Sequence, residues 1–183
     1  MKSQPHRDYK SDNVVQTPPD LARRIVSHYK PTGRILEPCR GRGNFLAQMP
    51  GAHWCEISEG RDFFEHSGQY DWIVTNPPWS LVRQFLQHSM KLAENIVFLM
   101  TVNHVWTKAR IRDVKERGFG LREICLVEFP ESFPSSGFQL GAMHFLKGWA
   151  GDIRPSDISI HSLPTKRLRI RSTTNQANFK SEL

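Results

Sequence analysis

Cysteines and long apolar runs are scarce in this sequence, and both absences limit what the chain can be. Its 183 residues include three cysteines, Cys39, Cys55 and Cys125, which lie far apart. None belongs to a CxxC or Cys/His pair with zinc-site spacing, so we expect reduced thiols in a cytoplasmic protein and no metal. No apolar run is long enough to span a bilayer, and residues 1–6 lack the apolar core of a signal peptide. We therefore expect no membrane partner.

Two common phosphate-binding loops are also absent. The first predicted strand-to-helix turn contains Gly41-x-Gly43, but position 46 is Leu, where a dinucleotide-binding GxGxxG loop has its third glycine. The sequence contains no GxxxxGK[ST] loop. These absences argue against a nicotinamide oxidoreductase, while the two glycines still allow a ligand to approach the backbone closely.

The composition is that of one globular domain with a basic charge balance. Hydrophobic residues make up 38% of the chain and charged residues 23%, which is enough to bury a substantial core at this length. The net charge of +7 and the isoelectric point near 9.6 suit a polyanionic partner such as DNA or RNA. An ordinary solvated basic surface explains the same charge, so charge alone does not decide between them.

Strand and helix patterns alternate along the chain. A helix is expected to begin at Thr17-Pro18-Pro19-Asp20, with Thr17 as its cap. Apolar runs predict strands over residues 34–36, 53–55, 70–75, 96–100, 124–129 and 142–146, and helical periodicity predicts helices over residues 44–48, 81–93 and 108–117. This alternation predicts a mostly parallel α/β sheet.

The ends of the chain differ in character from its middle. Residues 1–16 are polar, and we expect a flexible N-terminal segment before a domain over residues 17–150. Residues 151–183 read as a C-terminal extension with a basic, flexible tail that contains Lys166, Arg167, Arg169 and Arg171. Such a tail suits non-specific attraction to phosphate, although plain disorder explains it equally well.

The most informative motif is Asn76-Pro77-Pro78-Trp79, at the end of an apolar run. An Asn side-chain oxygen and the neighbouring backbone carbonyl can accept both hydrogens of an exocyclic amine, which localises the lone pair on its nitrogen. They also stabilise the positive charge that develops when that nitrogen is alkylated. The prolines stiffen the loop, and Trp79 offers a face on which a flipped-out base can stack.

Three acidic residues follow predicted strands or lie near their ends: Glu37, Glu56 and Asp62. Ligands of α/β sheets bind beyond the carboxyl ends of the strands, where these acids are expected. One carboxylate can accept the two hydroxyls of a ribose, another the amino group of a nucleobase, and Glu37 suits a cationic amino-acid end. Together they describe a nucleoside that carries an amino acid rather than a dinucleotide.

These motifs resemble, in order and spacing, those of class I S-adenosylmethionine-dependent amino-methyltransferases. The resemblance covers about residues 17–148 and is greatest to the N6-adenine DNA methyltransferases whose cofactor motifs precede the catalytic one. It rests on Thr17-Pro18, Glu37-Pro38-x-x-Gly41-x-Gly43-x-Phe45, Glu56, Asp62-Phe63 and Asn76-Pro77-Pro78-Trp79. It implies a Rossmann-like α/β fold: a mostly parallel seven-stranded sheet with helices on both faces and its last strand antiparallel.

The resemblance also implies roles for particular residues. Cofactor-binding positions are Thr17, Glu37, Pro38, Gly41, Gly43, Glu56, Asp62, Phe63 and Asn76, and the catalytic positions are Asn76, Pro77, Pro78 and Trp79. A loop between the last two predicted strands carries Phe133 and Phe138, which are candidates for contact with a flipped base or for simple packing of the loop.

Two departures from the family pattern concern the cofactor and the target. Arg40 and Arg42 flank Gly41, where small or apolar residues are more usual, and either crowd the cofactor or project toward solvent and phosphate. The family's DNA enzymes usually add a domain-sized target-recognition segment, and no such segment is evident here. Weak sequence specificity, a protein partner that supplies recognition, or a different substrate would each account for this.

The sequence therefore predicts an S-adenosylmethionine-dependent enzyme that methylates the N6 amine of adenine, with DNA as the expected substrate. The alternatives are an RNA adenine or protein glutamine methyltransferase, since both present planar nitrogens to related motifs. A catalytically idle cofactor-binding module that regulates a partner is a further alternative.

Overall fold

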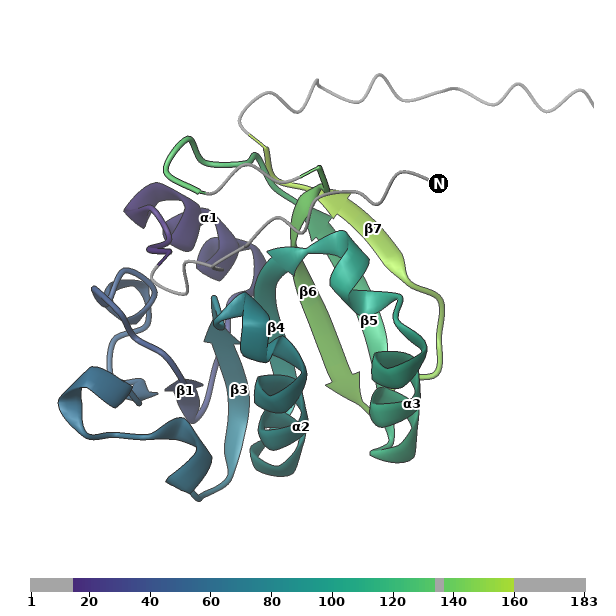
Figure 1. The fold of residues 1–183 in the computed structure, drawn as a ribbon, viewed down its shortest axis with the longest axis horizontal. Coiled ribbons are helices and arrows are strands. Elements are labelled where there is room, and N and C mark those ends of the chain that lie inside the picture. Colours follow the sequence, from purple (N-terminus) through teal and green to yellow (C-terminus); the bar gives the residue numbers. More distant parts are fainter. Residues whose placement is uncertain (1–14, 134–136, 160–183) are drawn as a thin grey trace, which may run out of the picture.

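The structure is a computed structural model that describes residues 15–133 and 137–159. Figure 1 shows α-helices packed on one twisted sheet. The helices are α1 (Pro19–Tyr29), α2 (Val82–Leu92) and α3 (Lys108–Glu116). The strands are β1 (Ile35–Glu37), β2 (His53–Trp54), β3 (Tyr70–Thr75), β4 (Ala93–Thr101), β5 (Phe119–Leu126), β6 (Leu140–Lys147) and β7 (Arg154–Asp157). Short 3-10 helices cover Leu46–Gln48, Ile57–Glu59, Phe63–Glu65, Trp79–Leu81 and Val102–Val105.

The seven strands form one sheet in the order β2-β1-β3-β4-β6-β5-β7. β6 is antiparallel to both of its neighbours, and every other pairing is parallel. The predicted mostly parallel, seven-stranded Rossmann-like sheet is confirmed. The expectation that the last strand is the antiparallel one was wrong, because β7 follows β6 in the chain and pairs parallel to β5.

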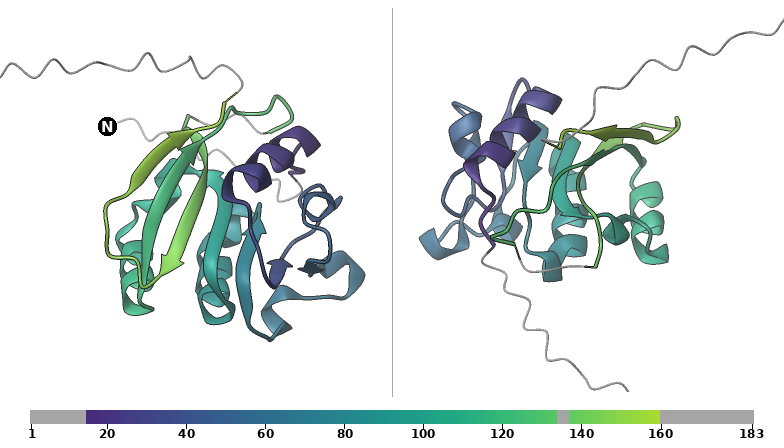
Figure 2. Two further views of the ribbon diagram at one scale, coloured as in Figure 1. Left: turned by 180° about the vertical axis from the view of Figure 1, so that it is seen from behind. Right: turned by 90° about the horizontal axis from the view of Figure 1, so that it is seen from above.

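Residues 96–100 of the central strand β4 form a continuous apolar run because both faces of the strand are covered there. Ile96, Phe98 and Met100 belong to the core beneath α2 and α3, whereas Val97 and Leu99 belong to the core beneath α1. This alternation follows from the period of two in a β-strand. Figure 1 shows α2 and α3 in front of the sheet, and the reverse view in Figure 2 shows α1 on the other side.

The start of α1 differs in detail from the prediction. Its first residue is Pro19, which suits the first helical turn because its missing N–H needs no partner there. Pro18 occupies the cap position and no side chain caps the helix, so the expected cap at Thr17 was wrong. Thr17 is instead buried, and its carbonyl accepts a hydrogen bond from Asn44 Nδ2 at 2.7 Å.

The connections on the β2-β1-β3 side are shorter than predicted. The helix expected over residues 44–48 is only a 3-10 turn (Leu46–Gln48), because Pro50 and Gly51 follow at once and leave too few residues to nucleate an α-helix. Two further 3-10 turns join β2 to β3. In the described part of the chain, no α-helix lies between β1 and β3.

The other edge of the sheet extends further than predicted. β5 ends at Leu126 rather than 129 and begins at Phe119, because its ladder with β6 starts there. β7 was not expected, since its residues are mostly exposed and it is joined to β5 by backbone pairing. The domain boundary expected at residue 150 therefore falls inside the sheet.

Two remaining expectations concern the ends of the chain and membranes. The basic tail with Lys166, Arg167, Arg169 and Arg171, and most of the N-terminal segment, lie outside the described residues. Within the described residues, no helix combines the length and apolar character needed to cross a bilayer.

Candidate functional site

A cavity of about 560 Å³ opens at the carboxyl ends of β1, β2 and β3. These strands are adjacent and parallel, so the residues that follow them meet at one edge of the sheet. The wall includes many of the predicted site residues, namely Thr17, Glu37, Pro38, Gly41, Glu56, Asp62, Phe63, Asn76 and Pro78. Five predicted residues, Gly43, Pro77, Trp79, Phe133 and Phe138, are not part of this wall.

Glu37, the last residue of β1, is a buried carboxyl at the base of the cavity wall. Its exposed fraction is 1%, and its Oε2 has no hydrogen-bond partner among the described residues. Burial raises the pKa of Glu37 to about 8, although the Leu46 N–H and the Arg40 charge act in the opposite direction. A buried carboxyl with one unpartnered oxygen is suited to a cationic or hydrogen-bond-donating group in the cavity.

Asn76 directly follows β3. The nitrogen of its side-chain amide has a hydrogen-bond partner and the oxygen has none in the described structure. Its Nδ2 donates to the Val15 carbonyl at 3.3 Å, whereas its Oδ1 is buried without a partner in the described structure. Its backbone carbonyl accepts a hydrogen bond from Cys39 Sγ at 3.2 Å, and that sulfur also lies 3.0 Å from Thr75 Oγ1. The amide is therefore anchored through its nitrogen, and its oxygen is the unused acceptor.

Glu56 ties the glycine-rich turn after β1 to the segment after β2. Its Oε2 accepts from the Gly41 N–H at 2.8 Å, and its Oε1 accepts from the Ser58 N–H at 3.2 Å and the Ser58 hydroxyl at 2.8 Å. Burial alone would raise the pKa of this carboxyl, but the hydrogen bonds from Ser58 and Gly41 prevail and lower it. Glu56 is therefore an ionised carboxylate at the cavity wall.

Gly41 allows the N-terminal strap, residues 15–17, to cross the turn. Its φ is +51°, and a Cβ at this position would lie 2.5 Å from Gln16 Oε1. The same Gln16 oxygen accepts from the Arg42 N–H at 2.9 Å. Gly43, with φ +79°, shapes the turn through a hydrogen bond to the Arg40 carbonyl but does not line the cavity.

The far wall of the cavity combines a carboxylate with apolar surface. Asp62 uses Oδ1 to accept from the Phe64 N–H at 2.8 Å, and Phe63 stacks on Phe85 with ring centroids 5.0 Å apart. Sequence reasoning missed Ile57, which lines the cavity with 74% of its surface exposed. The sequence feature that could have identified Ile57 is its position: it is an apolar residue directly after Glu56, beyond the end of a strand.

Arg40 lines the cavity, and two partners hold its guanidinium in place. Its guanidinium pairs with Glu59 and lies 4.2 Å from the centroid of the Trp54 ring, while Arg61 lies 3.8 Å from that centroid. The Trp54 ring thus holds the cationic ends of both arginines.

The Asn76-Pro77-Pro78-Trp79 loop ends in an aromatic cluster. The Trp79 ring meets the Phe129 and Phe133 rings edge-on, with centroids 6.4 and 6.1 Å away, and His104 lies 6.5 Å away. Phe133 is buried here, whereas Phe138 is exposed and shares with Phe133 a second hollow of about 570 Å³. Phe129 was assigned to a strand by the sequence pattern, so its place in this cluster was missed.

Comparison by sequence yields nothing: no family model and no curated protein matches the chain. Comparison by structure finds many similar chains. A Listeria monocytogenes protein assigned to the class I S-adenosylmethionine-dependent methyltransferases shares 12% identity with a TM-score of 0.56, over 80% of this chain and 67% of that one.

Proteins of restriction-modification systems are also similar in structure. The M protein of the type I restriction enzyme EcoKI shares 14% identity with a TM-score of 0.55, over 77% of this chain and 45% of that one. A dimethyladenosine transferase from Plasmodium falciparum shares 14% identity with a TM-score of 0.54, over 70% of this chain and 62% of that one. This chain thus spans less than half of the EcoKI subunit. Its mostly parallel seven-stranded sheet is the Rossmann-like fold of the class I S-adenosylmethionine-dependent methyltransferases.

Proposed function

We propose that the protein is an S-adenosylmethionine-dependent methyltransferase acting on the exocyclic N6 amine of adenine, with DNA as its substrate. The observation that carries this proposal is the buried, unpartnered Oδ1 of Asn76 in the wall of a cavity that also contains Glu37. That oxygen is a preorganised acceptor for an N–H group, held in position before any ligand arrives.

The cavity residues fit S-adenosylmethionine group by group. The unpartnered Oε2 of Glu37 suits the ammonium of the amino-acid end, and ionised Glu56 suits the ribose hydroxyls. Asp62 suits the adenine amine, and exposed Ile57 offers an apolar face for the adenine ring. When bound, the cofactor supplies a methyl group on a positively charged sulfonium.

Asn76 and Pro77 act on the acceptor amine in this proposal. Asn76 Oδ1 and the Pro77 carbonyl accept its two N–H hydrogens, which concentrates the lone pair on nitrogen and stabilises the positive charge that develops there. On transfer, the amine nitrogen would form the new C–N bond and would then release one of its own two protons to solvent, while the electrons of the broken C–S bond would stay with the cofactor. Most of the acceleration comes from holding the reactants in line.

The aromatic cluster supports a base as the acceptor. Trp79 offers a ring face on which a flipped-out adenine can stack, and Phe129 and Phe133 hold the edge of that ring. A net charge of +7 favours nucleic acid over an uncharged protein side chain. We propose DNA rather than RNA as the substrate, in line with the structural similarity to the M protein of a type I restriction enzyme. A protein partner that supplies target recognition and a cytoplasmic location are further parts of the proposal.

The test uses isotopically labelled S-adenosylmethionine with unmethylated duplex DNA, single-stranded DNA, total RNA and a protein extract in separate reactions. Digestion to nucleosides shows where the label goes. Label in N6-methyladenine of DNA, lost in Asn76→Ala, supports the proposal. Label in RNA or in glutamine side chains alone would move the activity to those substrates, and cofactor binding without any transfer would indicate an idle module.

A further inference from the structure

Three metal-binding side chains meet where α1 packs on β5, away from the cavity. His28 comes from the last turn of α1, and Glu123 and Cys125 come from β5. Their ligand atoms all lie within 4.8 Å of one another. None of the three lines the proposed cofactor cavity.

The fold explains why residues so distant in sequence converge here. Glu123 and Cys125 are two apart in a strand, so both side chains point to the face that α1 covers. β7 pairs with β5 so that Ser156 lies opposite Cys125, and the Ser156 hydroxyl donates to Glu123 Oε1. The group spans α1 and β5, and Ser156 adds a contact from β7.

The three side chains are more buried than those of a typical surface ion pair. Cys125 is fully buried, Glu123 is 6% exposed, and the His28 side chain is 21% exposed. His28 Nε2 lies 2.7 Å from Glu123 Oε1. Ligands of a tetrahedral zinc ion, with bonds of about 2.0–2.3 Å, lie about 3.3–3.8 Å from one another. The separations in this group, from 2.7 Å up to at most 4.8 Å, bracket that range.

The ligand types select the metal. One thiolate, one imidazole and one carboxylate form a set that zinc and related transition metals accept. Magnesium and calcium prefer oxygen-only sites, so Cys125 and His28 argue against them. Water or the Ser156 hydroxyl completes a four-coordinate site.

We propose that His28, Glu123 and Cys125 bind one zinc ion that fastens α1 to the edge of the sheet. Binding releases the Cys125 thiol proton to solvent and requires the His28 proton to reside on Nδ1, so that Nε2 can coordinate. The sequence predicted no metal because zinc motifs are recognised from ligands close in sequence, whereas His28 and Cys125 are brought together only by the fold.

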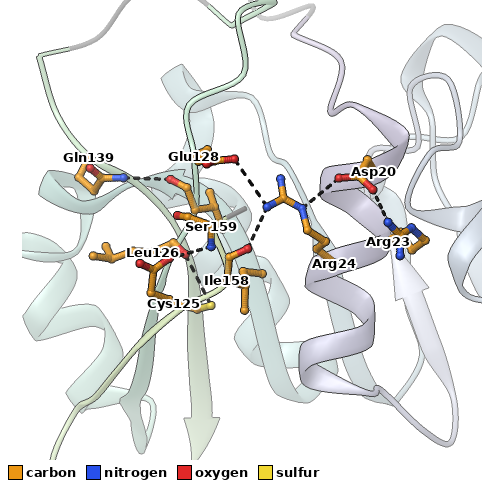
Figure 3. Close-up of polar contacts among 11 residues, drawn as sticks. Asp20, Arg23, Arg24, Cys125, Leu126, Glu128, Gln139, Ile158 and Ser159 are labelled. Atoms are coloured by element: carbon orange, nitrogen blue, oxygen red, sulfur yellow. Dashed lines mark hydrogen bonds and ion pairs between the residues drawn. The ribbon is translucent and has the colours of Figure 1, made fainter. Parts of the chain in front are cut away.

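One turn earlier on α1, Arg24 already connects this helix to the residues that follow β5 and β7. Arg24 Nη1 donates to the Ile158 carbonyl at 2.8 Å and lies 3.8 Å from Glu128 Oε2, and its Nε lies 3.1 Å from Asp20 Oδ2. Figure 3 shows this arginine between α1 and the β5–β7 edge, with Cys125 nearby. A zinc ion would add a second fastening to the helix that follows the cavity strap, so its role is structural.

The test is metal binding by the full, untagged chain after chelator treatment and dialysis. Zn²⁺ is added first, and Co²⁺ in a separate sample reports thiolate ligation through its charge-transfer absorption. We expect one equivalent per chain, and a melting temperature raised by about 5–10 °C at a hundredfold excess of Zn²⁺ over its dissociation constant. Cys125→Ser should lose the thiolate band and most of the shift.

Cys55→Ser is the matched control, because Cys55 is also buried but lies outside the group. It should bind cobalt and zinc as the wild type does. Circular dichroism of metal-free Cys125→Ser checks that it folds, and His28→Gln gives a second variant if it does not. Absence of stoichiometric binding by the wild type, or equal binding by folded Cys125→Ser or His28→Gln, would overturn the proposal. Neither result bears on methyl transfer.

Discussion

The two halves of the sheet are built in different ways. On one side, β4, β5 and β6 have nine, eight and eight residues and pair along almost their whole length. On the other, β1 has three residues and β2 has two, and 3-10 turns replace helices. Side-chain hydrogen bonds hold this second half, such as those from Gly41 to Glu56 and from Arg42 to Gln16.

The long-strand half stabilises the fold, whereas the short-strand half carries most of the groups that line the cavity. Ladders and apolar packing stabilise the long-strand half, and few of its residues line the cavity. In the short-strand half, the groups that hold the loops, such as Glu56, are also the groups that face the cavity. Changes in the long-strand half should therefore unfold the protein, whereas changes in the short-strand half should mainly affect ligands and turnover.

The largest effect is expected from Phe98→Ala in the long-strand half. Phe98 is completely buried in β4, and removing its ring leaves a cavity in the core. We expect a loss of about 3–5 kcal/mol in the free energy of unfolding, measured by urea denaturation. Phe138→Ala is the control, since that ring is 56% exposed and should change stability by less than about 1 kcal/mol. Equal losses of unfolding free energy in the two variants would contradict the assignment of fold stability to the long-strand half.

Asn76→Ala should lower activity strongly and stability only slightly. Losing the acceptor Oδ1 should slow methyl transfer by about 10²–10³-fold, as expected for one preorganised polar group. Single-turnover rates at saturating cofactor would measure this. The melting temperature should fall only slightly, because the variant loses one long hydrogen bond, from Nδ2 to the Val15 carbonyl, and Oδ1 has no partner in the described structure. Retained turnover in this variant would remove Asn76 from the mechanism.

Glu37 links stability to pH on the cavity side. Its folded-state pKa of about 8 lies above the usual 4.5, so between these values the unfolded chain is ionised while the folded chain holds the proton. The contribution of Glu37 to stability is therefore greatest below pH 4.5 and is lost as the pH rises toward 8, by up to about 1.4 kcal/mol per pH unit.

Denaturant unfolding of the wild type and Glu37→Gln at pH 6 and 7.5 isolates this effect. Glutamine cannot ionise, so the variant should lose less stability over this interval than the wild type. Other titrating groups, histidines included, contribute equally to both proteins. Identical pH dependence in the two would show that the Glu37 pKa is not raised.

The smallest effect is expected from Ile57→Ala. Ile57 is 74% exposed, so shortening it should leave stability unchanged while removing apolar surface from the proposed adenine site. We expect about tenfold weaker binding of S-adenosylmethionine by calorimetry. Ile111→Ala is the control, because Ile111 lies on α3 and is 39% exposed. Equal cofactor affinities of the two variants would exclude contact with Ile57.

Sequence reasoning was most accurate where periodicity is strong. β3 was predicted over its observed range, and α2 and α3 within one residue at each end, because their apolar patterns extend over several turns or a full strand. It failed at the 3-10 turn Leu46–Gln48, where a following proline limits length, and at β7, which backbone pairing rather than apolar residues defines.

The site was predicted by residue type but not by its contacts. Order along the chain placed Glu37, Glu56 and Asn76 after neighbouring strands, and the structure brings them to one cavity. The anchoring of the Asn76 amide through Nδ2 depends on Val15, 61 positions earlier in the sequence. The orientation of Arg40 depends on Trp54 in the next strand. Neither contact leaves a local signal in the sequence.

The most direct test of the central claim is calorimetric titration of S-adenosylmethionine into the wild type, Asp62→Ala and Asn76→Ala. The claim is that the cavity separates cofactor contacts from the group that acts on the acceptor. It predicts one-site binding by the wild type, similar binding by Asn76→Ala, and clearly weaker binding by Asp62→Ala. No binding by the wild type, or equal affinity in wild type and Asp62→Ala, would contradict it.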